Sequence, residues 1–238
     1  MLLKACLNGD RDPGEHPGLP VRPAALATDA VACVRLGAGA IHLHPRDDAG
    51  SETLAAAVVD ATVRHVRDAC GVPVGVATGA WVEPDPERRV ALVREWREPA
   101  FASVNLSEPG AVEVMRALLD GGRVGVEAGV WSVADAELLA ASGLADRVLR
   151  VLVEVIDVDA AAAPAHAAEI EAALDVLAIS APRLVHGEGE AAWPVLRHAV
   201  ARGRNTRIGL EDTLLRPDGS VAGGNVDLVG IARELGAG

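Results

Sequence analysis

Short apolar runs and longer amphipathic stretches alternate from one end of the chain to the other. Each run is rich in Val, Ile and Leu, and Ala, Leu, Arg and Glu dominate the stretch that follows it. The runs predict strands and the stretches between them predict helices. Strands are expected at 2–8, 40–44, 72–78, 101–106, 123–130, 147–156, 182–186 and 205–211. Helices are expected at 23–37, 51–70, 85–97, 109–120, 132–142, 162–177, 189–202 and 223–235.

The regular order of strand and helix predicts parallel βαβ units. Eight such units in 238 residues, without a linker or a change of composition, favour one (β/α)8 barrel domain over residues 1–238. An open, doubly wound sheet is the alternative. It is less favoured because the chain has neither a GxxxxGK phosphate loop nor a GxGxxG motif after the first strand.

The charge balance excludes several classes of partner. The formal net charge is −12, so a broad nucleic-acid surface or an anionic membrane surface is not expected. Aromatic residues make up only 2% of the chain, so a surface on which nucleic-acid bases stack is not expected. Lys4 is the only lysine and there is no tyrosine, which argues against Schiff-base chemistry and against a tyrosine general acid.

The cysteines and the N-terminal residues indicate the cellular compartment in which the protein is expected. Cys6, Cys33 and Cys70 lie far apart and form no CxxC pattern, which argues against a disulfide framework and against a cysteine zinc site. The first residues do not resemble a signal peptide, and no apolar run reaches the roughly 18 residues of a membrane span. A cytoplasmic setting is therefore expected.

A barrel of this kind carries its chemistry at the carboxyl ends of its strands. The polar residues that the pattern places there define the candidate site. They are Asn8 and Asp10 after the first strand, His42, His44, Arg46 and Asp47 at the second, Thr78 at the third, Asn105 and Ser107 at the fourth, Glu127 at the fifth, Glu154 and Asp157 at the sixth, His186 and Glu188 at the seventh, and Arg207, Glu211 and Asp212 at the eighth.

The sharpest local signal is the run from Ile41 to Asp47, which reads IHLHPRD. Strand side chains alternate between faces, so His42 and His44 share the inward face, about 6.5–7 Å apart along the strand. Two imidazoles in this arrangement can bind one metal ion, and zinc accepts neutral imidazole nitrogens readily. The alternative is a chance pair of histidines, each hydrogen-bonded to its neighbours.

The eighth strand offers a third ligand. By the same alternation, Arg207, Gly209 and Glu211 face inward, so Glu211 projects into the barrel mouth. Two histidines and a glutamate form a catalytic type of zinc site with open positions for substrate oxygens. The alternative for Glu211 and Asp212 is a solvated cap on the following loop.

The motifs together resemble the β-keto acid cleavage enzyme family, whose named member is the 3-keto-5-aminohexanoate cleavage enzyme. The resemblance rests on GAGAIHLHPRD from Gly37, Thr78-Gly79, Ser103-Val-Asn105 and GLEDT from Gly209, in matching order over essentially the whole chain. It implies a zinc-dependent (β/α)8 barrel. The reaction that it implies condenses a β-keto acid with acetyl-CoA and releases acetoacetate and a new acyl-CoA.

Carried over residue by residue, the resemblance assigns roles to the candidate site. His42, His44 and Glu211 resemble the zinc ligands, and Arg207 and Asp212 resemble the pair that removes the substrate proton. Glu127 matches a catalytic acidic position, and Asp10, Thr78, Gly79, Asn105 and Ser107 fall where the family binds the keto acid. A homotetramer is also implied. From the residues themselves, Arg207 is expected to keep Asp212 ionised near neutral pH.

The chain departs from the family pattern in its shorter loops, in Ala77, where a hydroxyl residue is usual, and in Asp10, which takes the place of a glutamate. These differences suggest an altered substrate preference. Two other readings stay open from the sequence: a metal-dependent aldolase or hydrolase that needs no CoA, and a non-catalytic barrel that binds a small anion.

Overall fold

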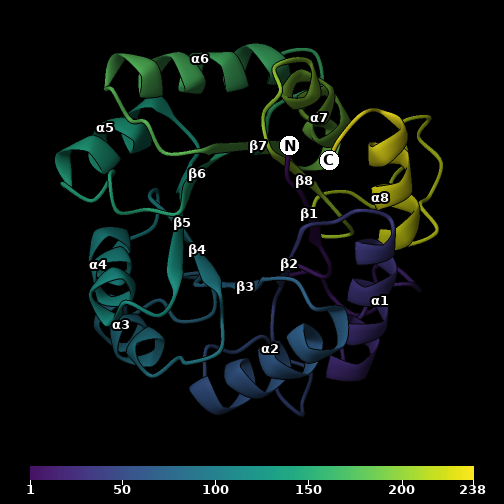
Figure 1. The fold of residues 1–238 in the computed structure, drawn as a ribbon, viewed down its shortest axis with the longest axis horizontal. Coiled ribbons are helices and arrows are strands. Elements are labelled where there is room, and N and C mark those ends of the chain that lie inside the picture. Colours follow the sequence, from purple (N-terminus) through teal and green to yellow (C-terminus); the bar gives the residue numbers. More distant parts are fainter.

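Eight parallel strands form a barrel inside an outer ring of helices in the computed structural model, which describes residues 1–238 (Figure 1). The strands are β1 (Leu3–Cys6), β2 (Ala40–Leu43), β3 (Val74–Ala77), β4 (Phe101–Asn105), β5 (Gly125–Val130), β6 (Arg150–Val155), β7 (Arg183–Gly187) and β8 (Thr206–Ile208). The helices are α1 (Pro23–Arg35), α2 (Ala56–Cys70), α3 (Pro86–Arg94), α4 (Ala111–Gly121), α5 (Val133–Ala141), α6 (Ala163–Val176), a 3-10 turn at Gly189–Ala191, α7 (Ala192–Ala201) and α8 (Asn225–Glu234).

The strand order confirms the predicted (β/α)8 barrel. Neighbours in the sequence pair in parallel from β1 to β7, and β8 pairs with β1. Two hydrogen bonds connect β7 with β8 and close the barrel. The backbone N–H of Val185 donates to the carbonyl of Asn205 at 2.8 Å, and Thr206 Oγ1 donates to the carbonyl of Val185 at 2.8 Å. An open sheet is thereby excluded.

The elements form where apolar side chains can be buried between the barrel and its helices. One continuous core contains the buried faces of the strands and of all eight long helices. Local signals set several helix ends. Asp85 and Ser132 accept backbone N–H groups at the starts of α3 and α5, and Gly71 adopts the left-handed conformation after α2.

Most elements are somewhat shorter than the hydrophobic pattern predicts, and two of these differences shape the site. Strand β8 ends at Ile208 rather than at residue 211, because the chain turns at Gly209, whose carbonyl accepts the N–H groups of Asp212 and Thr213. Helix α2 begins at Ala56 rather than at residue 51. Residues of the 51–55 segment instead form part of the barrel mouth, and Glu52 pairs there with Arg46 in an isolated bridge.

The interior of the barrel contains a buried ion pair between opposite walls. Lys4 of β1 lies 2.6 Å from Glu127 of β5, and both side chains are fully buried. Arg150 of β6 lies 3.3 Å from the same carboxylate. No helix of the protein combines the length and the apolar character that crossing a membrane requires.

Candidate metal centre and catalytic cavity

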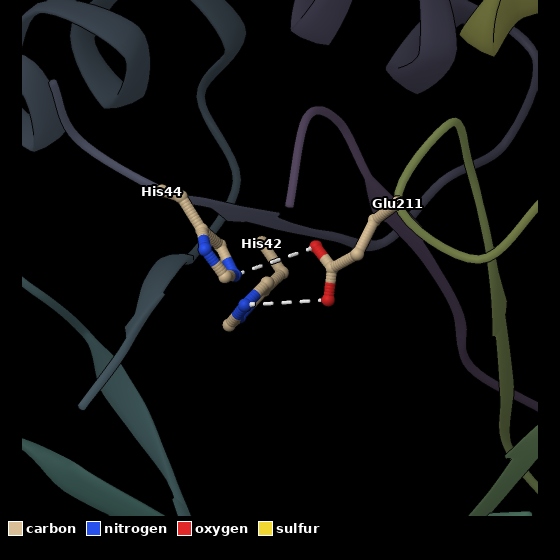
Figure 2. A group of neighbouring side chains, drawn as sticks. All are labelled: His42, His44 and Glu211. Atoms are coloured by element: carbon tan, nitrogen blue, oxygen red, sulfur yellow. Dashed lines mark ion pairs between the residues drawn. The ribbon is translucent and has the colours of Figure 1, made fainter. Parts of the chain in front are cut away.

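His42, His44 and Glu211 point toward one another at the mouth of the barrel (Figure 2). His42 Nε2 lies 3.7 Å from Glu211 Oε1, and His44 Nε2 lies 3.8 Å from Glu211 Oε2. One ligand atom from each residue lies within 4.8 Å of the other two. The structure therefore brings together the three residues that the sequence predicts as metal ligands.

A carboxamide and a carboxylate hold His44 in place, although it lies one residue beyond β2. Asn8 accepts the backbone N–H of His44 at 2.9 Å and donates to its carbonyl at 2.9 Å. Glu52 Oε1 lies 2.8 Å from Nδ1 of the imidazole. A carboxylate on one ring nitrogen fixes the ring and leaves the other nitrogen free to bind a metal.

Glu211 reaches the site from the turn after β8, not from the strand itself. Arg11 donates to the backbone carbonyl of Glu211 at 3.1 Å and to that of Leu210. Asn225 accepts the N–H of Leu210 at 2.7 Å and donates to the carbonyl of Leu7 at 2.8 Å. The inward direction of Glu211 therefore comes from this turn and its contacts with β1, and strand alternation does not explain it.

The donor set fits a divalent cation. His42 Nδ1 and Glu211 Oε2 are buried without a hydrogen-bond partner. Burial holds the pKa of His42 well below its usual range, so its ring is neutral, the form that binds metals. Burial alone would raise the pKa of Glu211, but the nearby positive charge, chiefly that of Arg207, lowers it below the usual range, so the carboxylate is charged.

Arg207 and Asp212 form a buried pair beside the three ligands. Arg207 Nε donates to Asp212 Oδ1 at 2.9 Å, and Arg207 Nη2 lies 3.0 Å from Glu211 Oε1 and 3.1 Å from Glu188 Oε1. Burial nevertheless raises the pKa of Asp212 to about 7. Desolvation of this fully buried carboxylate outweighs the guanidinium, so Asp212 titrates near neutral pH, whereas the sequence predicts that Arg207 keeps it ionised there.

A cavity of about 240 Å³ opens between these groups and two tryptophans. Its polar wall includes Asp10, Glu154 and Glu188 together with Arg207, while Asp212 is buried next to it. A larger groove of about 660 Å³ runs between α3 and α4, away from the strand ends, and contains none of the site residues. The complete lining of the cavity is Asp10, His42, His44, Ala77, Trp81, Ser103, Asn105, Trp131, Glu154, Ile156, Glu188, Arg207 and Glu211.

Comparison with known proteins decides the family. A sequence model of the β-keto acid cleavage enzymes matches residues 1–237. The chain belongs to this family. The match covers the whole barrel, including the candidate metal ligands at the end of β2 and after β8.

Solved structures share the fold at low sequence identity. The ternary complex of ObcA with C4-CoA adduct and oxalate aligns with a TM-score of 0.72, and its binary complex with oxaloacetate with 0.71. Each is 18% identical, and the alignment covers 92% of this chain and 63% of ObcA, so the chain spans less than two thirds of ObcA. 3-Dehydroquinate dehydratase from Geobacillus kaustophilus gives a TM-score of 0.63 at 12% identity, covering 98% of this chain and 89% of that one. These likenesses show a common barrel.

The residues that the family resemblance suggests for keto acid binding divide into two groups. Asp10 and Asn105 line the cavity. Thr78 and Ser107 are outside the lining, with the Thr78 hydroxyl donating to the Ser103 carbonyl at 2.8 Å and that of Ser107 donating to Asp135 at 3.0 Å. Gly79 also lies outside the lining, and Trp81 packs where its side chain would be.

Glu127, suggested as catalytic by the family resemblance, does not line the cavity. Lys4 and Arg150 hold its carboxylate inside the barrel, below the carboxyl end of β5. Its place in the middle of the strand, two positions before Gly129, could have indicated this depth. These contacts keep the carboxylate away from the cavity lining.

No sequence motif predicts several residues of the site. Glu52 lies in a segment that the pattern assigns to a helix, and Trp131 follows β5 without a distinctive neighbour. Trp131 Nε1 donates to Glu154 at 3.2 Å, and Trp81 Nε1 donates to Glu52 at 3.0 Å. The pattern places Glu154 and Glu188 at strand ends, which was the available signal for both.

Proposed function

We propose that the protein is a zinc-dependent β-keto acid cleavage enzyme that condenses a β-keto acid with acetyl-CoA and cleaves the adduct to acetoacetate and a new acyl-CoA. The observation that carries the proposal is the convergence of His42, His44 and Glu211 beside the Arg207–Asp212 pair, in a member of this family. ObcA, crystallised with oxaloacetate and with a C4-CoA adduct, supports a β-keto acid and a CoA ester as the reactants.

His42, His44 and Glu211 would hold the zinc ion, since two imidazoles and one carboxylate form a site with open coordination positions. When bound, zinc supplies a Lewis acid for the keto and carboxylate oxygens of the substrate and offsets the charge of an enolate. Glu52 holds the His44 ring in the orientation that leaves Nε2 free.

Arg207 would bind the negative charge of the substrate, and Asp212 would remove its proton. Arg207 lines the cavity and presents a guanidinium to an anionic substrate, and its Nε atom orients Asp212. We propose Asp212 as the general base, and its pKa of about 7 suits a base that works near neutral pH. Asp10 and Asn105 would contact the keto acid, while Thr78, Gly79 and Ser107 would shape the wall behind it.

The size of the cavity indicates which parts of the two substrates lie inside it. A volume of about 240 Å³ suits a small keto acid, so only the acyl end of the CoA ester would enter. Trp81, half exposed at the mouth, is placed to contact the thioester arm. A homotetramer in the cytoplasm remains the expected setting.

The deciding experiment measures acetoacetate and acyl-CoA by mass spectrometry for a panel of β-keto acids, with and without acetyl-CoA. We expect turnover only with acetyl-CoA, loss of turnover after treatment with a chelator, and recovery on addition of zinc. Metal analysis of the purified protein should find one zinc per chain. Equal cleavage without any CoA ester would replace this proposal with a metal-dependent aldolase or hydrolase.

A further inference from the structure

The arginine of the IHLHPRD run does not line the cavity, and its guanidinium donates only to backbone carbonyls. Arg46 Nη2 donates to the carbonyl of Arg11 at 2.6 Å and to that of Gly9 at 3.2 Å. Its Nη1 atom donates to the carbonyl of Gly50 at 3.1 Å. Two of these carbonyls belong to the loop after β1, on either side of Asp10. Arg46 therefore ties the loop after β2 to the loop after β1.

The loop after β1 in turn holds Glu211 in two ways. Gly9 packs directly on the Glu211 side chain, since a Cβ atom at Gly9 would lie 2.8 Å from Glu211 Cγ. The φ angle of Gly9 is +57°, a conformation that glycine adopts without strain. Arg11 donates to the carbonyls of Leu210 and Glu211, the latter at 3.1 Å. The loop that Arg46 fixes thus contacts both the side chain and the backbone of Glu211.

The order of the strands shows why a link across β1 matters. In the sheet β1 lies between β2 and β8, so a whole strand separates the segment that carries His42 and His44 from the turn that carries Glu211. No hydrogen bond runs from Arg46 to that turn. The connection at the mouth of the barrel passes through the loop after β1, which Arg46 reaches from one side and which Arg11 joins to the turn on the other.

We propose that Arg46 is a positioning residue for the metal site, which holds Glu211 in place through the loop after β1, with Arg11 as the second link. Arginine suits this place because its guanidinium is always charged and presents several N–H donors in one fixed plane to carbonyls on different segments. The role rests on the proposed function, in which Glu211 is a zinc ligand. The bracing itself is a property of the protein without metal or substrate.

Two narrower roles for Arg46 compete with this one. In the first, Arg46 serves only Asp10, which lines the cavity between the two carbonyls that Arg46 holds. That role predicts a change in KM for the keto acid with unchanged zinc affinity. In the second, Arg46 only closes its own loop through Gly50. That role predicts effects that do not depend on Arg11.

The first test needs neither metal nor activity. Hydrogen–deuterium exchange of the metal-free protein, measured by mass spectrometry, compares the wild type with Arg46→Met and Arg11→Met at residues 209–213. We expect several-fold faster exchange there in both variants, because a released loop leaves the turn free to open. Unchanged exchange at 209–213 in Arg46→Met, or faster exchange confined to 46–52, would contradict the link.

The second test measures zinc affinity, by competition with a chromophoric chelator, in a double-mutant cycle. We expect Arg46→Met and Arg11→Met each to weaken zinc binding roughly 10-fold or more, the usual effect of losing a group that orients a metal ligand. Because both act through one loop, the double variant should bind zinc only slightly more weakly than the weaker single variant. Arg46→Lys should recover part of the affinity, since an ammonium still donates to carbonyls.

Two further measurements separate positioning from a general loss of structure. With zinc at saturation, kcat of Arg46→Met should stay within several-fold of the wild type, because the bound ion then holds Glu211. Arg22→Met is the matched control for both tests. Arg22 reaches the same loop after β2 by a single exposed contact, to the carbonyl of Asp48 at 3.4 Å, and should leave exchange at 209–213 and zinc affinity unchanged.

Three results of the second test would overturn the proposal: wild-type zinc affinity in Arg46→Met, a change confined to KM, or losses that multiply in the double variant. Should Arg46→Met fail to fold, Arg46→Lys and Arg11→Met carry both tests. A wild-type protein that binds zinc without acetyl-CoA-dependent cleavage would refute the proposed function and leave the affinity test valid. If the wild type binds no zinc, exchange at 209–213 still decides whether Arg46 braces the turn.

Discussion

Glu211 and Asp212 are neighbours in the chain but have different surroundings. Glu211 faces two histidines at 3.7 and 3.8 Å, and Arg207 lowers its pKa against the effect of burial. Asp212 is fully buried, and burial raises its pKa to about 7. A carboxylate binds a metal in its ionised form and a general base has to exchange its proton, so the two environments suit the two proposed roles.

Amide substitutions should separate these roles. We expect Glu211→Gln to lose bound zinc, because an amide oxygen is a weaker ligand than a carboxylate. Asp212→Asn should keep zinc and bind keto acid nearly normally, while kcat falls by about 10²-fold or more through loss of the base. Metal content and kcat, measured on both variants, check this. Loss of zinc in Asp212→Asn, or near-wild-type activity, would show that the assignment is wrong.

The turn after β8 is the element on which the site depends most. It carries both Glu211 and Asp212, and it packs directly on β1. A side chain at Gly209 would place its Cβ atom 1.8 Å from the carbonyl oxygen of Cys6. No rotation of a side chain can relieve that contact because the neighbouring atom belongs to the backbone. Glycine is therefore required here by close packing of two chain segments.

Gly209→Ala should accordingly force the turn away from β1. We expect a loss of roughly 1–3 kcal/mol or more in the free energy of unfolding, together with weaker zinc binding, because Glu211 moves with the turn. Gly121→Ala is the matched control, since nothing lies within 4 Å of its added Cβ atom. Denaturant unfolding and metal titration measure both effects. Wild-type zinc affinity in Gly209→Ala would contradict this account of the turn.

Across the whole molecule, the Lys4–Glu127 pair joins opposite walls of the barrel beneath the site. Its atoms lie 2.6 Å apart, with Arg150 at 3.3 Å on the other carboxylate oxygen and Phe101 under both cations. The only lysine of the chain is thus used inside the barrel. Each oxygen of the Glu127 carboxylate thus faces a cation inside the barrel, and the residue does not line the cavity.

Removing one member of the pair should destabilise the whole barrel. We expect Lys4→Met to lower the free energy of unfolding by roughly 3 kcal/mol, the lower end for a broken buried ion pair, since Arg150 remains with Glu127. The double variant Lys4→Met with Glu127→Gln should recover part of the loss, because no uncompensated charge remains. Denaturant titrations compare the three proteins. A fully stable Lys4→Met protein would exclude a structural role for the pair.

The hydrophobic pattern of the sequence determined the fold, because alternating buried strands and one-sided helices permit few arrangements. It also predicted where the two histidines lie, at the end of β2, where strand alternation places His42 inward. Only the tertiary structure decided how Glu211 reaches them, since the turn at Gly209, and not the strand period, sets its direction. The same holds for Glu52, the contacts of Arg46 and the pKa of Asp212. Each of these depends on contacts between segments far apart in the chain, and local periodicity carries no information about such contacts.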